Sequence, residues 1–255
     1  MMGYQLVLYV LWGAIRDRLL LTVVMAMAVV SAISMFMGSA AVVEQAAFTQ
    51  VFLASGLRIV GVLGLVLFIV FFIRRSFDTK DVEFMLARPI GRIQYLMSYS
   101  LAFSLIAIFL GAVCGLLVYG FAIQSAGMGL VLWTLTIMAE YIVIANMALF
   151  IAMVLSSASA SAMVCFGFYL LCRMSGQFLG ITDSFSNVNA LSPYLNALFQ
   201  VISVFLPRLD LAGQTSWLVY GVESPAQVAF IIAQSIIFSI FLLSASLIDL
   251  IRRQF

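Results

Sequence analysis

The sequence predicts an all-α integral membrane protein with six transmembrane helices. Hydrophobic residues make up 65% of the 255 residues and charged residues only 9%, whereas soluble domains carry roughly 25% charged residues. None of the apolar stretches alternates with a period of two residues, which disfavours a β-barrel. Five charge-free stretches exceed the ~20 residues that a helix needs to cross a bilayer: 19–43, 93–139, 141–172, 184–207 and 224–248.

Turn-forming residues divide the apolar sequence into spans. The run 93–139 is too long for one helix and divides at 122–129, which is rich in Gly, Ser and Gln. Arg58 falls near the start of the second span, where we expect its side chain to reach outward to the interface. The predicted spans are 19–40, 55–73, 93–121, 130–153, 160–181 and 226–248, which together form a single transmembrane domain over residues 1–255.

The basic residues predict the orientation. Six spans place both termini on one side, and nine of the twelve Lys and Arg residues fall on that side. Because basic residues in short loops mark the cytoplasmic face, both termini are expected in the cytoplasm of a multi-pass protein of the inner membrane. Trp133 and Trp217 are expected in an aromatic belt on the opposite face. The nine residues are Arg16, Arg18, Arg74, Arg75, Lys80, Arg88, Arg92, Arg252 and Arg253.

The segment 189–206 is apolar enough for a seventh span. A crossing there would move the C-terminal arginines to the outer side, and the segment contains Asn189, Pro193, Asn196 and Gln200. We therefore expect a re-entrant or interfacial pair of short helices on the outer side, buried against protein. An ordinary seventh span remains the alternative.

The N-terminal segment and the turn between spans two and three are the amphipathic parts of the chain. Residues 1–18 place Leu6, Tyr9, Val10 and Gly13 on one side, which predicts an interfacial helix. In the turn 78–92, Asp78 is expected to cap a short helix that ends at Pro89, and the third span is expected to begin there. Its apolar stripe is Val82, Met85 and Leu86.

Two interpretations of this turn remain open on physical grounds. A basic loop can bind anionic lipid without any further partner. The acidic residues Asp78, Asp81 and Glu83 lie among the basic ones, however. Such interleaving of both signs suits the surface of a protein partner better than a lipid surface.

The sequence "VEFMLARPIGRIQYL" resembles the cytoplasmic segment of permease subunits of type II ABC exporters. In these proteins spans two and three are joined by an acidic residue, a Leu-rich turn, Arg-Pro-Ile-x-Arg and a Tyr-Leu pair. The six spans, the N-terminal amphipathic helix and the elaborated outer segment also fit, so the resemblance covers nearly the whole chain. The matching residues are Glu83, Leu86, Arg88, Pro89, Ile90, Arg92, Tyr95 and Leu96.

The resemblance implies that this turn is a coupling helix that docks on a separate ATP-binding subunit. It implies a complex of two ATPase subunits and two permease chains (identical or homologous), embedded in lipid, that moves an amphipathic or lipid-like substrate outward. ATP and Mg²⁺ would then bind to the partner, and no cofactor, metal or nucleic acid to this chain. The coupling residues would be Asp81, Glu83, Leu86, Arg88, Pro89, Ile90 and Arg92.

Other function classes are less favoured. The chain has no P-loop motif, and its lack of His removes the commonest metal ligand and proton carrier. An intramembrane enzyme is therefore disfavoured, and we expect no catalytic residue. A non-catalytic scaffold or assembly factor stays an alternative.

Glu140 and Arg173 are the charges deepest within the predicted spans. Since an ionised group at the bilayer centre costs about 2.5–3.5 kcal/mol on insertion scales, we expect them to form an ion pair at similar depth. Gly111 and Gly115 form a GxxxG pattern, which permits close helix approach and is compatible with a dimer interface. The three cysteines (Cys114, Cys165 and Cys172) are expected to be buried apolar residues.

Overall fold

The computed structural model describes residues 2–40, 44–79, 91–121, 127–185, 206–221 and 225–252. Within these ranges the chain is all-α, as predicted, and six of the described helices are long and apolar enough to span a membrane. The structure thus confirms an all-α, multi-pass membrane protein. The helices are α1 (Met2–Arg16), α2 (Arg18–Ser39), α3 (Gln45–Asp78), α5 (Arg92–Phe121), α6 (Met128–Val154), α7 (Ala158–Phe185), α9 (Ser216–Tyr220) and α10 (Pro225–Arg252).

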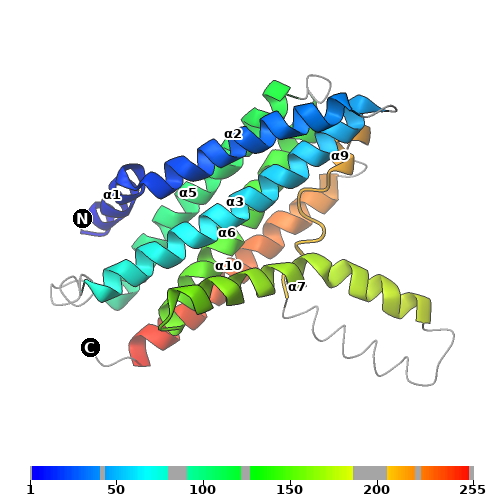
Figure 1. The fold of residues 1–255 in the computed structure, drawn as a ribbon. Helices are drawn as coiled ribbons and strands as arrows, with labels where there is room; N and C mark the ends of the chain where they lie inside the picture. Colours follow the sequence, from blue (N-terminus) through cyan, green and yellow to red (C-terminus); the bar gives the residue numbers. More distant parts are fainter. Residues whose placement is uncertain are drawn as a thin grey trace.

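The long helices run side by side, and both described ends of the chain lie at the same end of the bundle (Figure 1). Helix α7 crosses the others obliquely, and its C-terminal half extends away from them. Helix α6 is central: its most apolar window is 78% buried, against 22% for α2 and 17% for α10. Helices α2 and α10 therefore present most of their surface to whatever surrounds the chain.

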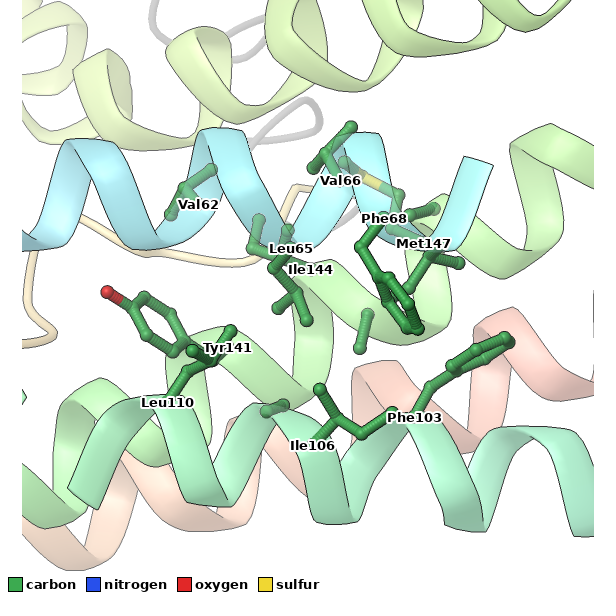
Figure 2. Close-up of a cluster of buried hydrophobic side chains, with 14 of the residues drawn as sticks. Val62, Leu65, Val66, Phe68, Phe103, Ile106, Leu110, Tyr141, Ile144 and Met147 are labelled. Atoms are coloured by element: carbon green, nitrogen blue, oxygen red, sulfur yellow. The ribbon is translucent and has the colours of Figure 1, made fainter. Parts of the chain in front are cut away.

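The core lies between α3, α5 and α6. Figure 2 shows Phe68 of α3 and Phe103 of α5 approaching Met147 of α6. The two phenylalanine rings meet edge to face with their centroids 6.3 Å apart, a geometry that aromatic pairs prefer. The three helices are thereby held as one packed unit.

Two helix boundaries differ from the sequence predictions. Helix α3 begins at Gln45 instead of residue 55, and its 34 residues make it about 51 Å long. Asp78 is the last residue of α3, so it does not cap the start of a new helix. Helix α5 begins at Arg92 and not at Pro89, and the backbone carbonyl of Gly91 accepts its first hydrogen bond, from the Tyr95 amide at 3.0 Å.

Small residues allow close contacts within the chain. A Cβ atom on Gly111 would lie 2.7 Å from the Met138 side chain, and one on Gly115 would lie 2.6 Å from Thr134. Both glycines are buried. The GxxxG pattern therefore packs α5 against α6 of the same chain and does not form a free dimer surface.

The N-terminal helix α1 packs on the bundle. Its buried residues are Leu6, Val10 and Ala14, whereas Tyr9 is 45% exposed and does not belong to the buried face. Helices α1 and α5 are in contact. Only Asp17 separates α1 from α2, and its carboxylate caps α2 by accepting a hydrogen bond from the Leu19 amide at 3.0 Å.

Arginines connect the helix ends at the basic end of the bundle. Arg74 of α3 donates a hydrogen bond to the carbonyl of Leu155, just after α6, at 2.9 Å. Arg92 of α5 donates to Leu250 and Ile251 near the end of α10, at 3.1 and 2.8 Å. The end of α3 is thus joined to the end of α6, and the start of α5 to the end of α10. Lys80, Arg88 and Arg253 lie outside the described residues.

Candidate functional site: a non-helical strap held by buried arginines

Residues 206–215, here called the strap, are a non-helical segment packed against the helix bundle. Pro207, Leu209, Ala212 and Gly213 within it are buried. Its described internal backbone hydrogen bonds are few, from Leu209 to Pro207 at 2.8 Å and from Ala212 to Leu209 at 3.2 Å. Because non-helical backbone at membrane depth is tolerated only when its polar groups find partners in the protein, side chains must supply the remaining partners.

Side chains of α3 and α6 converge on Gly213. Its carbonyl accepts hydrogen bonds from the Arg58 guanidinium and from the Trp133 indole Nε1, the latter at 3.1 Å. Its amide donates to the Thr136 hydroxyl at 3.1 Å. Gly213 has a φ of +53°, and a Cβ atom there would overlap the Ile137 side chain. The position requires glycine for its backbone conformation and for the space around it.

Helix α7 holds the other half of the strap. Arg173 donates from Nη1 to the carbonyls of Leu209 and Ala212, the latter at 2.9 Å. The Ser175 hydroxyl donates to Asp210 Oδ1 at 3.1 Å. Asp210 also forms an ion pair with Arg208 at 3.2 Å. The strap is therefore bound by charged groups on two sides, from α3 and from α7.

The buried carboxylate of Glu140 compensates the charge of Arg58. Glu140 is 0% exposed and Arg58 is 5% exposed. Arg58 Nε lies 3.5 Å from Glu140 Oε2, and the Tyr169 hydroxyl donates to Glu140 Oε1 at 3.1 Å. A carboxylate and a guanidinium thus share a buried site, and each has a second partner.

This geometry corrects two predictions. Arg58 does not reach outward to the interface; it is buried and ion-paired. Glu140 pairs with Arg58 rather than with Arg173, whose Nη1 binds strap carbonyls. The reason is the longer α3: Arg58 stands thirteen residues inside the helix and not three residues after its start.

The cluster lies far from the basic end of the bundle. Arg58 precedes Arg74 by sixteen residues in α3, and Glu140 precedes Leu155 by fifteen along α6. At 1.5 Å per residue these separations are about 24 and 22 Å. Since Arg74 and Leu155 are hydrogen-bonded to each other, the two charges lie at the same depth. A hydrocarbon core of about 30 Å that begins at that level would place both charges in its distal half.

The two tryptophans that the sequence assigns to an outer aromatic belt are inside the protein. Trp133 is 0% exposed and Trp217 is 4% exposed. Trp133 uses its N–H to hold Gly213. The belt prediction is therefore wrong for both residues. Trp133 is hydrogen-bonded to the strap, and Trp217 is a buried residue of α9.

The remaining predicted residues are placed as follows. Asp81, Glu83, Leu86, Arg88, Pro89 and Ile90 lie outside the described residues, as does 189–205. Arg92 is half-buried and holds the end of α10. The three cysteines have free thiols and are buried, as predicted. Within the described ranges, no three His, Cys, Asp or Glu residues are grouped closely enough to bind a metal ion.

The sequence did not reveal the strap's partners. Arg58 and Gly213 are 155 residues apart, and Trp133 and Gly213 are 80 apart, so no local pattern connects them. The sequence does indicate that partners must exist, because Arg58, Glu140 and Arg173 lie within otherwise apolar sequence and such charges require partners.

No protein-family model matches this chain, and no curated protein matches it in sequence. What can be said of the protein therefore comes from its fold and its site. It is an all-α, multi-pass membrane protein with a buried ionic cluster that holds a non-helical strap.

Proposed function

We propose that the chain is the membrane-spanning permease subunit of an ATP-driven ABC exporter. The observation that carries the proposal is the charged motif at 83–92, which follows one spanning helix, α3, and leads into the next, α5. The helix ends that flank the motif are hydrogen-bonded to other spans, α3 to the end of α6 and α5 to the end of α10. A separate ATPase that docks there would act on two spans at once.

The packing supports a route from this end to the strap. Helix α3 is unbroken from Gln45 to Asp78 and carries Arg58 about 30 Å from its last residue. A rigid helix that is displaced at one end moves at the other, and Arg58 is bound to both Glu140 and the strap. Closure of the ATPase pair at the basic end would therefore shift the ionic cluster and the strap with it.

The two termini of the six-span arrangement are expected in the cytoplasm, where the ATPase is. Substrate would leave on the strap side, and ATP hydrolysis would take place on the partner. The transported molecule is expected to be amphipathic or lipid-like, and a second permease chain would complete the pathway.

Affinity purification of the tagged protein from native membranes tests the proposal. The expected result is stoichiometric recovery of an ATP-binding protein, with ATP hydrolysis by the purified complex. Pro89→Ala should preserve this recovery and weaken the coupling between hydrolysis and transport, because the short helix that the sequence predicts before Pro89 would then be able to continue into α5. Recovery of the chain with no ATPase in a mild detergent that preserves membrane complexes would indicate a scaffold instead.

A further inference from the structure

A pocket lies between the strap, α9 and the start of α10. Its volume is about 340 Å³, within the range of about 300–1,000 Å³ that is typical of small-molecule sites. The strap lines it with Leu211 and Gln214, α9 with Trp217, and the first turns of α10 with Ala226, Gln227 and Phe230. Figure 1 shows α9 beside the start of α10, at the end remote from both termini.

The strap is two-sided. Leu211 and Gln214 line the pocket, whereas the intervening Ala212 and Gly213 carry the carbonyls that bind Arg173 and Arg58. A molecule in the pocket would therefore contact Leu211 and Gln214, which flank the two residues, Ala212 and Gly213, that the buried arginines hold.

The chemistry of the pocket selects a class of ligand. None of the described residues that line it is charged, and most are apolar or aromatic. The nearby strap charges, Arg208 and Asp210, are paired with each other. The two glutamine carboxamides each offer donors and an acceptor, which match a hydroxyl or an ester and not an ionic head group.

The pocket borders an exposed apolar face of α10. Phe230 of the lining is 56% exposed. Ile237 and Phe241 follow it at i+7 and i+11 on the same face of α10, and they are 65% and 57% exposed. An acyl chain anchored in the pocket could continue along this face towards the centre of the bilayer.

We propose that this pocket binds a neutral single-chain amphiphile, with its hydroxyl or ester head group on Gln214 and Gln227 and its acyl chain along α10, and that the bound molecule braces the strap. The binding requires no ATPase. Its test is therefore independent of the proposed function.

The probe is a monoacylglycerol with a photoreactive diazirine in its acyl chain, added to the purified protein in phosphatidylcholine nanodiscs. Cross-linked peptides are identified by mass spectrometry. We expect labelling concentrated in 211–217 and 226–231, loss of labelling when unlabelled monoacylglycerol is added, and a rise in melting temperature with the unlabelled compound. The same acyl chain on a sulfate or trimethylammonium head group should label these peptides weakly.

Two variants of α10 form a matched pair. Ala226→Trp fills the pocket, and Ala229→Trp adds the same side chain at an exposed position that does not line it. We expect the first to lose the labelling and the thermal shift and the second to keep both. Gln214→Leu combined with Gln227→Leu should abolish the preference for the neutral head group. This double variant tests the proposal if Ala226→Trp fails to fold.

Labelling spread over the exposed faces of α2 and α10 in proportion to their exposure would overturn the proposal, since it would indicate annular lipid only. Equal labelling by the charged probes would overturn it as well, as would labelling that persists in folded Ala226→Trp.

Discussion

The Arg58–Glu140 pair is expected to be the strongest energetic coupling in the membrane part of the molecule. The perturbation is a double-mutant cycle with Arg58→Met and Glu140→Gln. Each single change leaves a buried group without its partner, whereas the double change removes both charges together. We expect strong coupling because Arg58 Nε and Glu140 Oε2 are 3.5 Å apart and both side chains are almost fully buried.

The expected magnitudes follow from the contacts. Removing one partner of a buried ion pair costs about 3–5 kcal/mol. Glu140→Gln should lie near the lower end, about 3 kcal/mol, because Arg58 keeps the carbonyls of Ala212 and Gly213. Arg58→Met should cost about 4 kcal/mol, since it also removes hydrogen bonds to the strap. With a coupling of about 2 kcal/mol, the double variant should lose about 5 kcal/mol.

The assay is reversible unfolding of the purified protein by SDS in mixed micelles, followed by tryptophan fluorescence. A second cycle, Arg173→Met with Glu140→Gln, is the control. Arg173 is hydrogen-bonded to carbonyls of the strap, whereas the ion pair of Glu140 is with Arg58, so the coupling of Arg173 to Glu140 should be clearly smaller than that of Arg58. A coupling of zero between Arg58 and Glu140, or one smaller than the control cycle, would refute the assignment of the pair.

Three further predictions concern the strap, the helix packing and the topology. Gly213→Ala should destabilise the protein by more than about 2 kcal/mol, because it combines an unfavourable φ with a clash. The measurement is thermal melting. The control is Gly120→Ala, where a Cβ atom meets open space, and it should change stability by less than about 1 kcal/mol. Gly115→Val should lower the folded yield without altering the oligomeric state on size-exclusion chromatography, since this glycine contacts α6 of its own chain; a dissociated but well-folded variant would contradict this. In a cysteine-free background, a cysteine at Tyr220, which is 84% exposed, should react with impermeant maleimide in intact cells. A cysteine at Gln254 should react only after lysis, and its labelling in intact cells would mean that the termini are not both cytoplasmic.

The spans could be predicted from the sequence because a bilayer imposes a strong local constraint on composition. The apolar run at 19–43 becomes α2, and the division of 93–139 separates α5 from α6. The first part of α3, residues 45–54, was missed because Gln45, Thr49 and Gln50 interrupt its apolar character. In the structure Gln50 is buried within the bundle, so helix packing accommodates what a hydropathy pattern rejects.

The candidate site was only partly predictable. Glu140 and Arg173 could be identified from their isolation in apolar sequence, but the choice of partner depends on where α3 begins and how the strap folds. Arg58 looked interfacial because its predicted helix was too short. The GxxxG motif was read correctly as a close-packing signal, whereas its partner, α6, follows only from the three-dimensional arrangement.

The central claim, that an ATPase binds at the charged turn, is tested most directly by charge reversal there. Glu83→Lys combined with Arg88→Glu keeps the net charge of the turn, so attraction to anionic lipid should be preserved. Complementarity to a protein surface depends on the position of each charge and would be lost. The measurement is recovery of the ATPase with the tagged chain, and its ATP hydrolysis, at equal membrane levels of both proteins. We predict normal insertion with a clear loss of ATPase recovery and activity; unchanged recovery and activity would contradict the coupling role and indicate a lipid-binding turn.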